Sequence, residues 1–275
     1  MIVDSHQHFW ELSRFEYPWL GEVGPVLKRD FLPDHLLLLL KEAGVERTVV
    51  VQAHQSVDET CWLLDLARQK SFIAGVVGWV DLKDPGVGET LDELLQEPFF
   101  KGVRHVWHDE PNDDWIMQPE VIRGLKELAK RQIPYDFLTF PRHLKFIPRI
   151  LDEVPGLCAV VDHISKPPIA RGDLQPWRRD LSRVAHETNV SCKVSGMVTE
   201  ADHQNWAVHD LRPYVEAVLE MFGCKRLMFG SDWPVCTLAA SYGEVVAAAL
   251  ETLGGVSAKQ KEALFGGNAE RFYNL

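Results

Sequence analysis

Short apolar runs alternate with amphipathic segments along the whole chain. Residues 47–52 form a continuous β-branched run, which is typical of a strand buried on both faces. Residues 119–131 instead place apolar side chains on one helical stripe, and a leucine-rich segment begins at Pro33 and ends before Gly44. The pattern therefore predicts strands and helices that take turns from one end of the sequence to the other.

Eight strands are predicted, at residues 2–8, 47–52, 72–80, 101–107, 133–137, 157–163, 190–196 and 226–234. Helices are predicted at residues 33–42, 59–69, 89–96, 119–131, 141–151, 176–188, 211–222, 243–253 and 257–265. This alternation indicates an α/β protein with a parallel sheet, and eight units in 275 residues predict a single-domain (β/α)8 TIM barrel over residues 1–275. A doubly wound sheet would carry a glycine-rich phosphate turn after the first strand, where this chain has His6-Gln7-His8.

Composition and charge narrow the possible partners. The chain is 46% hydrophobic and 25% charged, which is the balance of a globular protein with a large core. Its formal net charge of −11 disfavours binding to nucleic acid or to an anionic membrane surface. The five cysteines form no Cys-x-x-Cys pair, and no basic-then-apolar leader precedes the first strand. We therefore expect a cytoplasmic protein whose partners are small molecules and, as an open possibility, further copies of itself.

Polar residues follow several of the predicted strands. In a parallel barrel, the carboxyl ends of the strands form the mouth that carries the active site. Alternate residues of a strand share a face, so Asp4, His6 and His8 are expected on one side. One such residue is more often a solvated or capping group, but three histidines and an aspartate from several strands favour a functional centre. The strand-end residues are His6, His8, His54, Arg104, His105, Trp107, Asp136, His163, Ser195 and Asp232.

Motifs spread over nearly the whole chain resemble those of the amidohydrolase superfamily of barrels. The segments that carry this resemblance are Asp4-x-His6-x-His8, Val161-Asp162-His163 and Gly230-Ser231-Asp232-Trp233-Pro234. Further local motifs resemble those of a narrower branch of the superfamily, which contains sugar lactonases and the pyrone-dicarboxylate lactonase. In this chain these motifs lie at residues 4–10, 17–19, 101–105, 109–111 and 142–144. The resemblance implies a distorted amidohydrolase-like TIM barrel and a hydrolase that opens the lactone of a sugar acid.

Lactone opening requires a base for water, stabilisation of the growing charge on the carbonyl oxygen, and an acid for the leaving ring oxygen. Asp232 is the best-placed carboxylate for the first and last tasks. His6, His8, His163 and Arg104 are expected to polarise the carbonyl. The residues expected to shape the sugar pocket are Trp10, His105, Trp107, Asp136 and Trp206.

The same side chains could hold a metal ion. His6, His8, His163 and Asp232 form an acceptable nitrogen and oxygen shell for a single Zn²⁺. A two-metal site, as the resemblance describes it, also needs a bridging lysine at the end of the fourth strand or a glutamate or histidine on the fifth. Here Lys101 lies at the beginning of its strand and the fifth strand offers Asp136. We expect at most one metal ion and a reaction that does not strictly require it.

Two other functions remain open from the residues. A metal-dependent decarboxylase of the same superfamily would use the same three histidines and aspartate, and would need its metal absolutely. A non-catalytic barrel that binds a sugar acid would retain these residues without turnover. The segments at 9–25 and 197–206 are expected to be loops that influence the choice of substrate.

Overall fold

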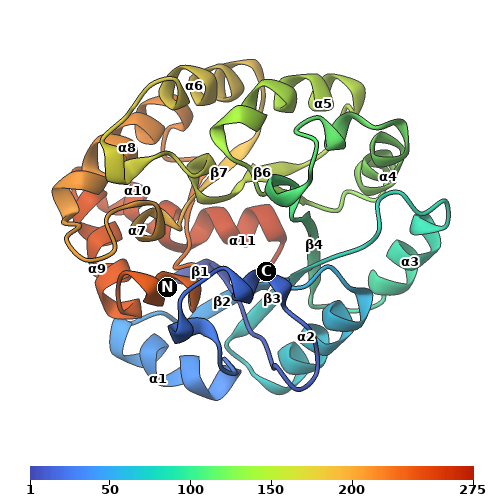
Figure 1. Ribbon diagram of the computed structural model, residues 1–275, viewed down its shortest axis with the longest axis horizontal. Coiled ribbons are helices and arrows are strands. Elements are labelled where there is room, and N and C mark those ends of the chain that lie inside the picture. The colour runs from blue at the N-terminus through green and yellow to red at the C-terminus, as the bar shows by residue number, and fades with distance from the viewer.

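The computed structural model describes residues 1–275 and contains one eight-stranded parallel sheet whose strand order follows the sequence from β1 to β8. The strands are β1 Val3–Gln7, β2 Arg47–Val51, β3 Ile73–Gly78, β4 Phe100–His105, β5 Tyr135–Phe137, β6 Ala159–Val161, β7 Ser191–Val194 and β8 Leu227–Phe229. Helices surround these strands (Figure 1), so the predicted (β/α)8 barrel is confirmed.

The α-helices of the ring alternate with the strands. They are α1 Pro33–Ala43, α2 Val57–Gln69, α3 Val87–Leu94, α4 Pro119–Lys130, α5 Ile147–Glu153, α6 Trp177–Glu187, α7 Met197–Glu200, α8 Val208–Phe222, α9 Tyr242–Thr252, α10 Ala258–Glu262 and α11 Asn268–Tyr273. Their boundaries have local causes. Pro33 occupies the first turn of α1, Gly44 ends that helix with a φ of 68°, and the Ser56 hydroxyl accepts hydrogen bonds from two amides at the start of α2. None of these helices is long and apolar enough to cross a membrane.

The barrel closes where β1 meets the turn after β8. The His8 amide donates to the Trp233 carbonyl at 2.7 Å, and the Asp232 amide donates to the His6 carbonyl at 2.8 Å. Gln7 and Trp233 form an isolated parallel bridge at the same place. Because these bonds join the two ends of the sheet, residues more than 220 positions apart become neighbours at the mouth.

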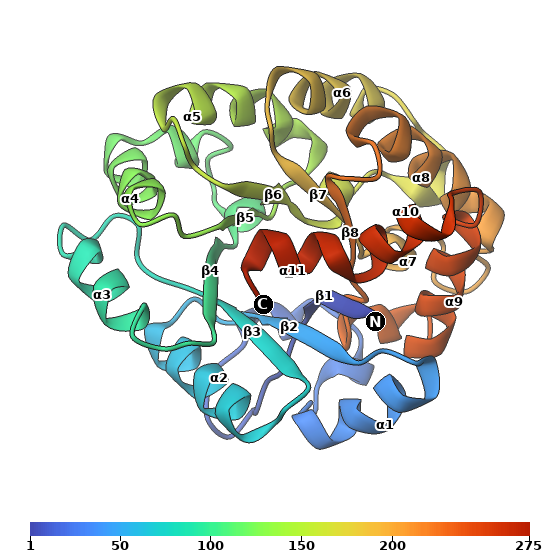
Figure 2. The same ribbon diagram turned by 180° about the vertical axis from the view of Figure 1, so that it is seen from behind.

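The bottom of the barrel is covered by α11, which lies across the strands when the molecule is seen from behind (Figure 2). Tyr273 of this helix is 1% exposed and packs among apolar side chains from inside the barrel, including Val3, Val49 and Met228. The sequence pattern predicts the last helix to end at Phe265 and therefore misses α11.

Several predicted strands end earlier than expected, among them β6 at Val161 and β8 at Phe229. The chain then leaves the extended conformation, and both His163 (φ 53°) and Asp232 (φ 59°) are left-handed. The expected loop at 197–206 also begins with a short helix, α7. His163 and Asp232 therefore lie on turns just beyond β6 and β8, so the direction of each side chain does not follow the alternation of a strand.

Candidate active site

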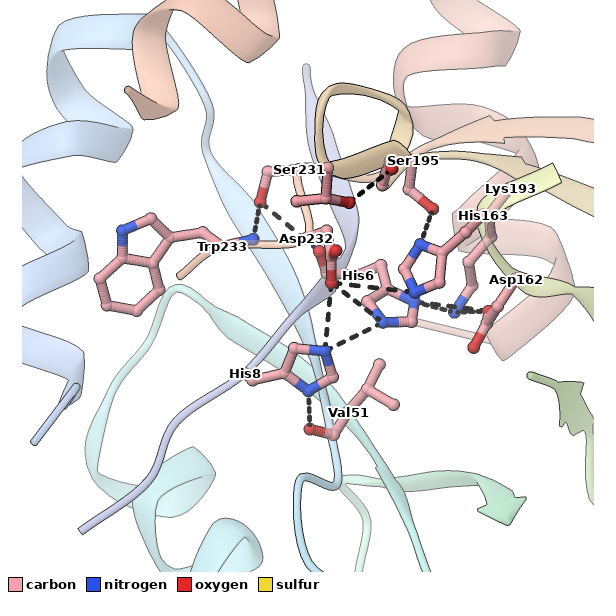
Figure 3. Close-up of polar contacts among 12 residues, drawn as sticks. His6, His8, Val51, Asp162, His163, Lys193, Ser195, Ser231, Asp232 and Trp233 are labelled. Atoms are coloured by element: carbon pink, nitrogen blue, oxygen red, sulfur yellow. Dashed lines mark hydrogen bonds and ion pairs between the residues drawn. The ribbon is translucent and has the colours of Figure 1, made fainter. Parts of the chain in front are cut away.

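Four side chains converge at the mouth of the barrel. His6 and His8 come from the end of β1, His163 follows β6, and Asp232 follows β8 (Figure 3). The two Nε2 atoms of His6 and His8 are 3.2 Å apart, and Asp232 Oδ1 lies 3.4 Å from His8 Nε2. The same oxygen is 3.9 Å from His6 Nε2 and 3.8 Å from His163 Nε2. The three histidines and the aspartate thus surround one point, as the sequence predicts.

Asp4 does not join this cluster. The register between β1 and β2 shifts between Asp4 and Gln7, so the expected alternation along β1 is broken. The Asp4 carboxylate instead accepts hydrogen bonds from the Ser231 amide at 2.8 Å and from the Tyr242 hydroxyl at 3.1 Å. Burial raises its pKa to about 6. Asp4 therefore braces β1 against the turn that carries Asp232.

The turn after β6 has an uncommon backbone. His163, Ile164, Ser165 and Lys166 are consecutive left-handed residues, with φ between 47° and 62°. A left-handed conformation costs a non-glycine residue roughly 1–2 kcal/mol, and such strain tends to persist where function requires the geometry. This turn aims His163 at Asp232 and places the half-buried Lys166 beside the mouth, where its Nζ lies 3.3 Å from Glu200 Oε1.

Two glycines allow the rings to approach the backbone. A Cβ atom on Gly230 would lie 2.7 Å from the Cβ of His6, and one on Gly196 would lie 2.6 Å from Nδ1 of His163. Gly196 also has a φ of 62°, which disfavours other residues. These two positions therefore leave room only for a hydrogen atom beside His6 and His163.

Hydrogen bonds fix the orientation of two histidines. His8 Nδ1 lies 2.8 Å from the Val51 carbonyl oxygen and must donate to it, because a carbonyl only accepts. The neutral His8 ring therefore presents a lone pair at Nε2. His163 Nδ1 lies 2.9 Å from the Ser195 hydroxyl, which leaves its Nε2 facing Asp232. Anchoring one ring nitrogen in this way is typical of histidines that ligate a metal through the other nitrogen.

Burial sets the charge state of the centre. The pKa values of His6 and His163 are lowered well below the ordinary value, and that of His8 is lowered as well, with desolvation as the largest cause in each. Burial works against ionisation of Asp232 too, but the neighbouring His163 and His8 bring its pKa below the ordinary value. At neutral pH the centre therefore contains neutral imidazoles around one carboxylate.

Three of the four side chains, His6, His8 and Asp232, have ligand atoms within 4.8 Å of one another and fit a single metal ion. Tetrahedral Zn²⁺ with bonds near 2.0 Å places its ligand atoms roughly 3.3 Å apart. The distances of 3.2–3.9 Å around Asp232 Oδ1 and the two β1 imidazoles match this spacing. Nitrogen and carboxylate donors are also the set that zinc prefers. His6, His8 and Asp232 are thus spaced to hold one divalent cation, and His163 as its fourth ligand stays a prediction.

Comparison with known proteins agrees with this geometry. Residues 3–275 match the family model described as amidohydrolase. The chain belongs to the amidohydrolase family. It is 38% identical to an L-fucono-1,5-lactonase of Burkholderia ambifaria, with 99% of this chain and 95% of that protein covered. An L-fucono-1,5-lactonase of Burkholderia multivorans is 39% identical, with coverage of 99% and 96%.

A solved structure shows the same architecture. The crystal structure of an amidohydrolase from Burkholderia multivorans with bound zinc superposes with a TM-score of 0.93 and 38% identity, covering 100% of this chain and 99% of that one. The resemblance to amidohydrolases that the sequence motifs predict is thus confirmed over nearly the whole of this chain.

Three of the residues expected to line a substrate pocket of this amidohydrolase face the interior. Trp10 and Trp107 have no exposed surface, and their indole nitrogens donate to the Arg29 and Asp113 carbonyls. Asp136 is also fully buried and binds inside the barrel. Each of these three side chains packs inside the protein here, and their contact with substrate stays a prediction.

The other expected pocket residues lie nearer to solvent. His105 stacks on Trp115 with ring centroids 3.9 Å apart, and its Nε2 lies 2.7 Å from Glu110 Oε1. Trp206 is half-buried and donates to the Ala239 carbonyl at 2.9 Å. His54 packs against Phe15 of the first long loop, away from the four-residue centre.

A buried ionic cluster under the centre of the amidohydrolase escaped the sequence interpretation. The cluster lies inside the barrel and consists of Lys193 of β7, Asp136 of β5, Arg104 of β4, and Asp162, which directly follows β6. Arg104 Nη1 is 3.3 Å from His6 Nε2, as expected from its place on β4, but Arg104 Nη2 is engaged by the Gln52 carbonyl. A lysine in the middle of an otherwise apolar seventh strand was the one available signal for Lys193.

Proposed function

We propose that this amidohydrolase opens the lactone of a sugar acid, L-fucono-1,5-lactone or a related aldonolactone, to the free acid. The observation that supports this most directly is the convergence of Asp232 with His6, His8 and His163 at the mouth of the barrel. Two relatives of known activity, both more than a third identical over their full length, are L-fucono-1,5-lactonases.

Asp232 is the general base and acid of the proposed reaction. Its low pKa keeps the carboxylate ionised at neutral pH, so it can take a proton from the attacking water. The water oxygen then bonds to the lactone carbonyl carbon. When the ring C–O bond breaks, Asp232 returns the proton to the leaving oxygen, which gives a hydroxyl and a carboxylic acid. One carboxylate therefore serves both proton transfers without net change.

The histidines contribute mainly as neutral lone-pair groups. His8 cannot donate from Nε2 while its Nδ1 proton is held by Val51, so it suits the role of ligand or acceptor better than that of oxyanion donor. A bound divalent metal would lower the pKa of its water to about 7 and polarise the carbonyl. His6, His8, His163 and Asp232 would hold that ion. The earlier expectation that catalysis does not strictly require metal stays a prediction.

Two cations can stabilise the developing negative charge. Arg104 lies beneath His6, from where its guanidinium adds positive potential to the centre. Lys166 is half-buried at the mouth, and its charge contributes to the lowered pKa of Asp232. Lys166 is therefore the cation that a substrate entering from solvent would meet first.

Acid release from a panel of lactones tests the proposal. L-fucono-, L-rhamnono-, L-galactono- and D-galactonolactone would be incubated with the protein before and after exhaustive chelation. We expect turnover of at least one lactone far above its spontaneous rate. Absence of turnover with every lactone, in both metal-loaded and chelated protein, would contradict the proposal. Activity that survives chelation would support the metal-independent reaction, whereas loss and rescue by Zn²⁺ would overturn that part.

The same assay separates the two other functions considered from the sequence. A decarboxylase would release carbon dioxide from an aromatic acid and lose all activity on chelation. A non-catalytic barrel would bind the sugar acid without accelerating hydrolysis. Neither function is favoured by a contact in this structure, whereas the lactonase relatives favour ester hydrolysis.

A further inference from the structure

An ammonium group lies at the centre of the barrel, directly under His6. Lys193 has no exposed surface, and its Nζ is 2.6 Å from Asp136 Oδ2, 3.1 Å from Asp162 Oδ1 and 3.1 Å from His6 Nδ1 (Figure 3 shows its contacts with His6 and Asp162). The interior of a TM barrel is usually filled by branched apolar side chains. Burying a charge there is costly unless it is fully paired, so this arrangement calls for an explanation.

The C-terminal helix holds the ammonium in place from below. The Tyr273 hydroxyl of α11 contacts both carboxylate oxygens of Asp136, at 2.9 and 2.8 Å. Asp136 in turn accepts from Lys193. An ammonium has three hydrogens to donate, and three acceptors surround it here. Each hydrogen of the Lys193 ammonium thus has an acceptor, and Tyr273 holds the Asp136 carboxylate in place. The positive charge is therefore fixed beside His6.

Lys193 and a metal ion would compete through the same imidazole ring. Two donors approach the His6 ring: Lys193 Nζ lies 3.1 Å from Nδ1, and Arg104 Nη1 lies 3.3 Å from Nε2. If Lys193, the closer of the two, donates to Nδ1, the ring proton is on Nε2 and can donate to His8 Nε2 at 3.2 Å. A metal ion needs the lone pair at that Nε2. The proton must then move to Nδ1, where Asp162 Oδ1 can accept it at 3.4 Å. The nearby positive charge also repels a second cation.

We propose that Lys193 is a positioning residue whose fixed charge orients His6 and weakens divalent-cation binding, so that the centre holds at most one ion. The ammonium occupies the interior position between Asp136 and Asp162 where a second cation would otherwise be attracted. Asp136 thereby gains a role as the anchor of Lys193. The inference rests on the proposed function only in taking the four converging side chains as the functional centre.

Zn²⁺ affinity tests this inference without reference to turnover. Lys193→Met alone would leave the buried Asp136 carboxylate without a cation, so the sharper comparison is between Asp136→Asn and the double variant Lys193→Met/Asp136→Asn. These two proteins differ only by the ammonium. Titration calorimetry on chelated protein, with elemental analysis of bound zinc, should show Zn²⁺ binding at least about tenfold tighter in the double variant. Equal affinities, or no binding by either, would overturn the inference.

A matched control removes the same charge elsewhere on the barrel. Lys101 lies at the start of β4, and its Nζ donates to the Asn274 carbonyl at the bottom of the molecule. Lys101→Met should leave Zn²⁺ affinity within about twofold of the parent protein, because its charge is remote from His6. A rise equal to that of the double variant would attribute the effect to net charge and contradict a specific role for Lys193.

A spectroscopic measurement covers the case in which the double variant does not fold. Nitrogen-15 chemical shifts of His6 in the chelated parent protein should report a proton on Nε2 and an acceptor at Nδ1. A proton on Nδ1 would contradict the proposed contact with Lys193. Lactone hydrolysis is recorded separately: absence of turnover with the expected zinc affinities would reject the proposed function and leave this inference standing.

Discussion

Individual residues at the mouth have little room to change, and Gly196 illustrates this best. Gly196→Ala should lower kcat for lactone hydrolysis at least about tenfold, because its Cβ would meet His163 Nδ1 at 2.6 Å and displace the ring. Gly172 has a similar left-handed backbone (φ 69°, ψ 13°) with nothing within 4 Å, so Gly172→Ala matches the backbone strain without the clash. Steady-state kinetics of both variants decide the matter: equal activity would show that the clash is unimportant.

At this scale the sequence predicted the converging residues better than the pocket walls. The spacing of His6 and His8 and their place beside Asp232 follow from strand ends meeting at one rim. Trp10 and Trp107 are fully buried, which could not be predicted because residue type does not reveal whether a side chain at a strand end turns toward the opening or into the packed loops. Lys193 was missed because its partners come from strands far apart in sequence.

At the scale of elements, α11 is the segment whose contribution the sequence concealed. Tyr273→Phe should lower the free energy of unfolding by about 1–2 kcal/mol, because the buried Asp136 carboxylate loses a donor. Tyr214 is equally enclosed, but its hydroxyl has no hydrogen-bond partner, so Tyr214→Phe is the matched control. Urea denaturation of both variants measures the difference. Similar losses in the two would mean that the contact with Asp136 adds nothing.

Most elements could be predicted because each long helix and buried strand has its own periodic signal. The short α7 and α11 span about one turn each and lack a full amphipathic repeat. The left-handed turn from His163 to Lys166 contains no glycine, which is the residue that would normally mark positive φ. Its strain is imposed by tertiary contacts, so the ends of β6 and β8 were placed too late.

For the whole molecule, buried histidines should dominate the pH dependence of stability. Burial lowers the pKa of seven histidines, namely His6, His8, His54, His105, His108, His143 and His163. As pH falls through about 6.5, the unfolded chain takes up protons that the folded chain refuses, so folding loses free energy. Asp4, Asp136 and Glu59 act in the opposite direction, since burial raises their pKa values to about 6, 6 and 7.

Seven histidines that lose stability on acidification, against three carboxyl groups that gain it, predict a net loss of stability toward acid. Chemical denaturation of chelated protein should give a lower free energy of unfolding at about pH 5.5 than at about pH 7.5. An equal or higher value at the acidic pH would show that the buried carboxyl groups outweigh the histidines. The prediction of one domain over residues 1–275 stays a prediction, and a single cooperative transition in the same experiment would support it.

The account depends most on Asp232 as the group that moves protons. Replacing it with asparagine keeps the size of the side chain and removes the base, so kcat for the preferred lactone should fall roughly 10³-fold while binding of the sugar acid is retained. Asp109→Asn, at a rim carboxylate that pairs with His108 at 2.9 Å, is the matched control and should keep activity within about threefold. Measured side by side, an Asp232→Asn enzyme retaining more than about a tenth of the parent rate would contradict the proposed chemistry.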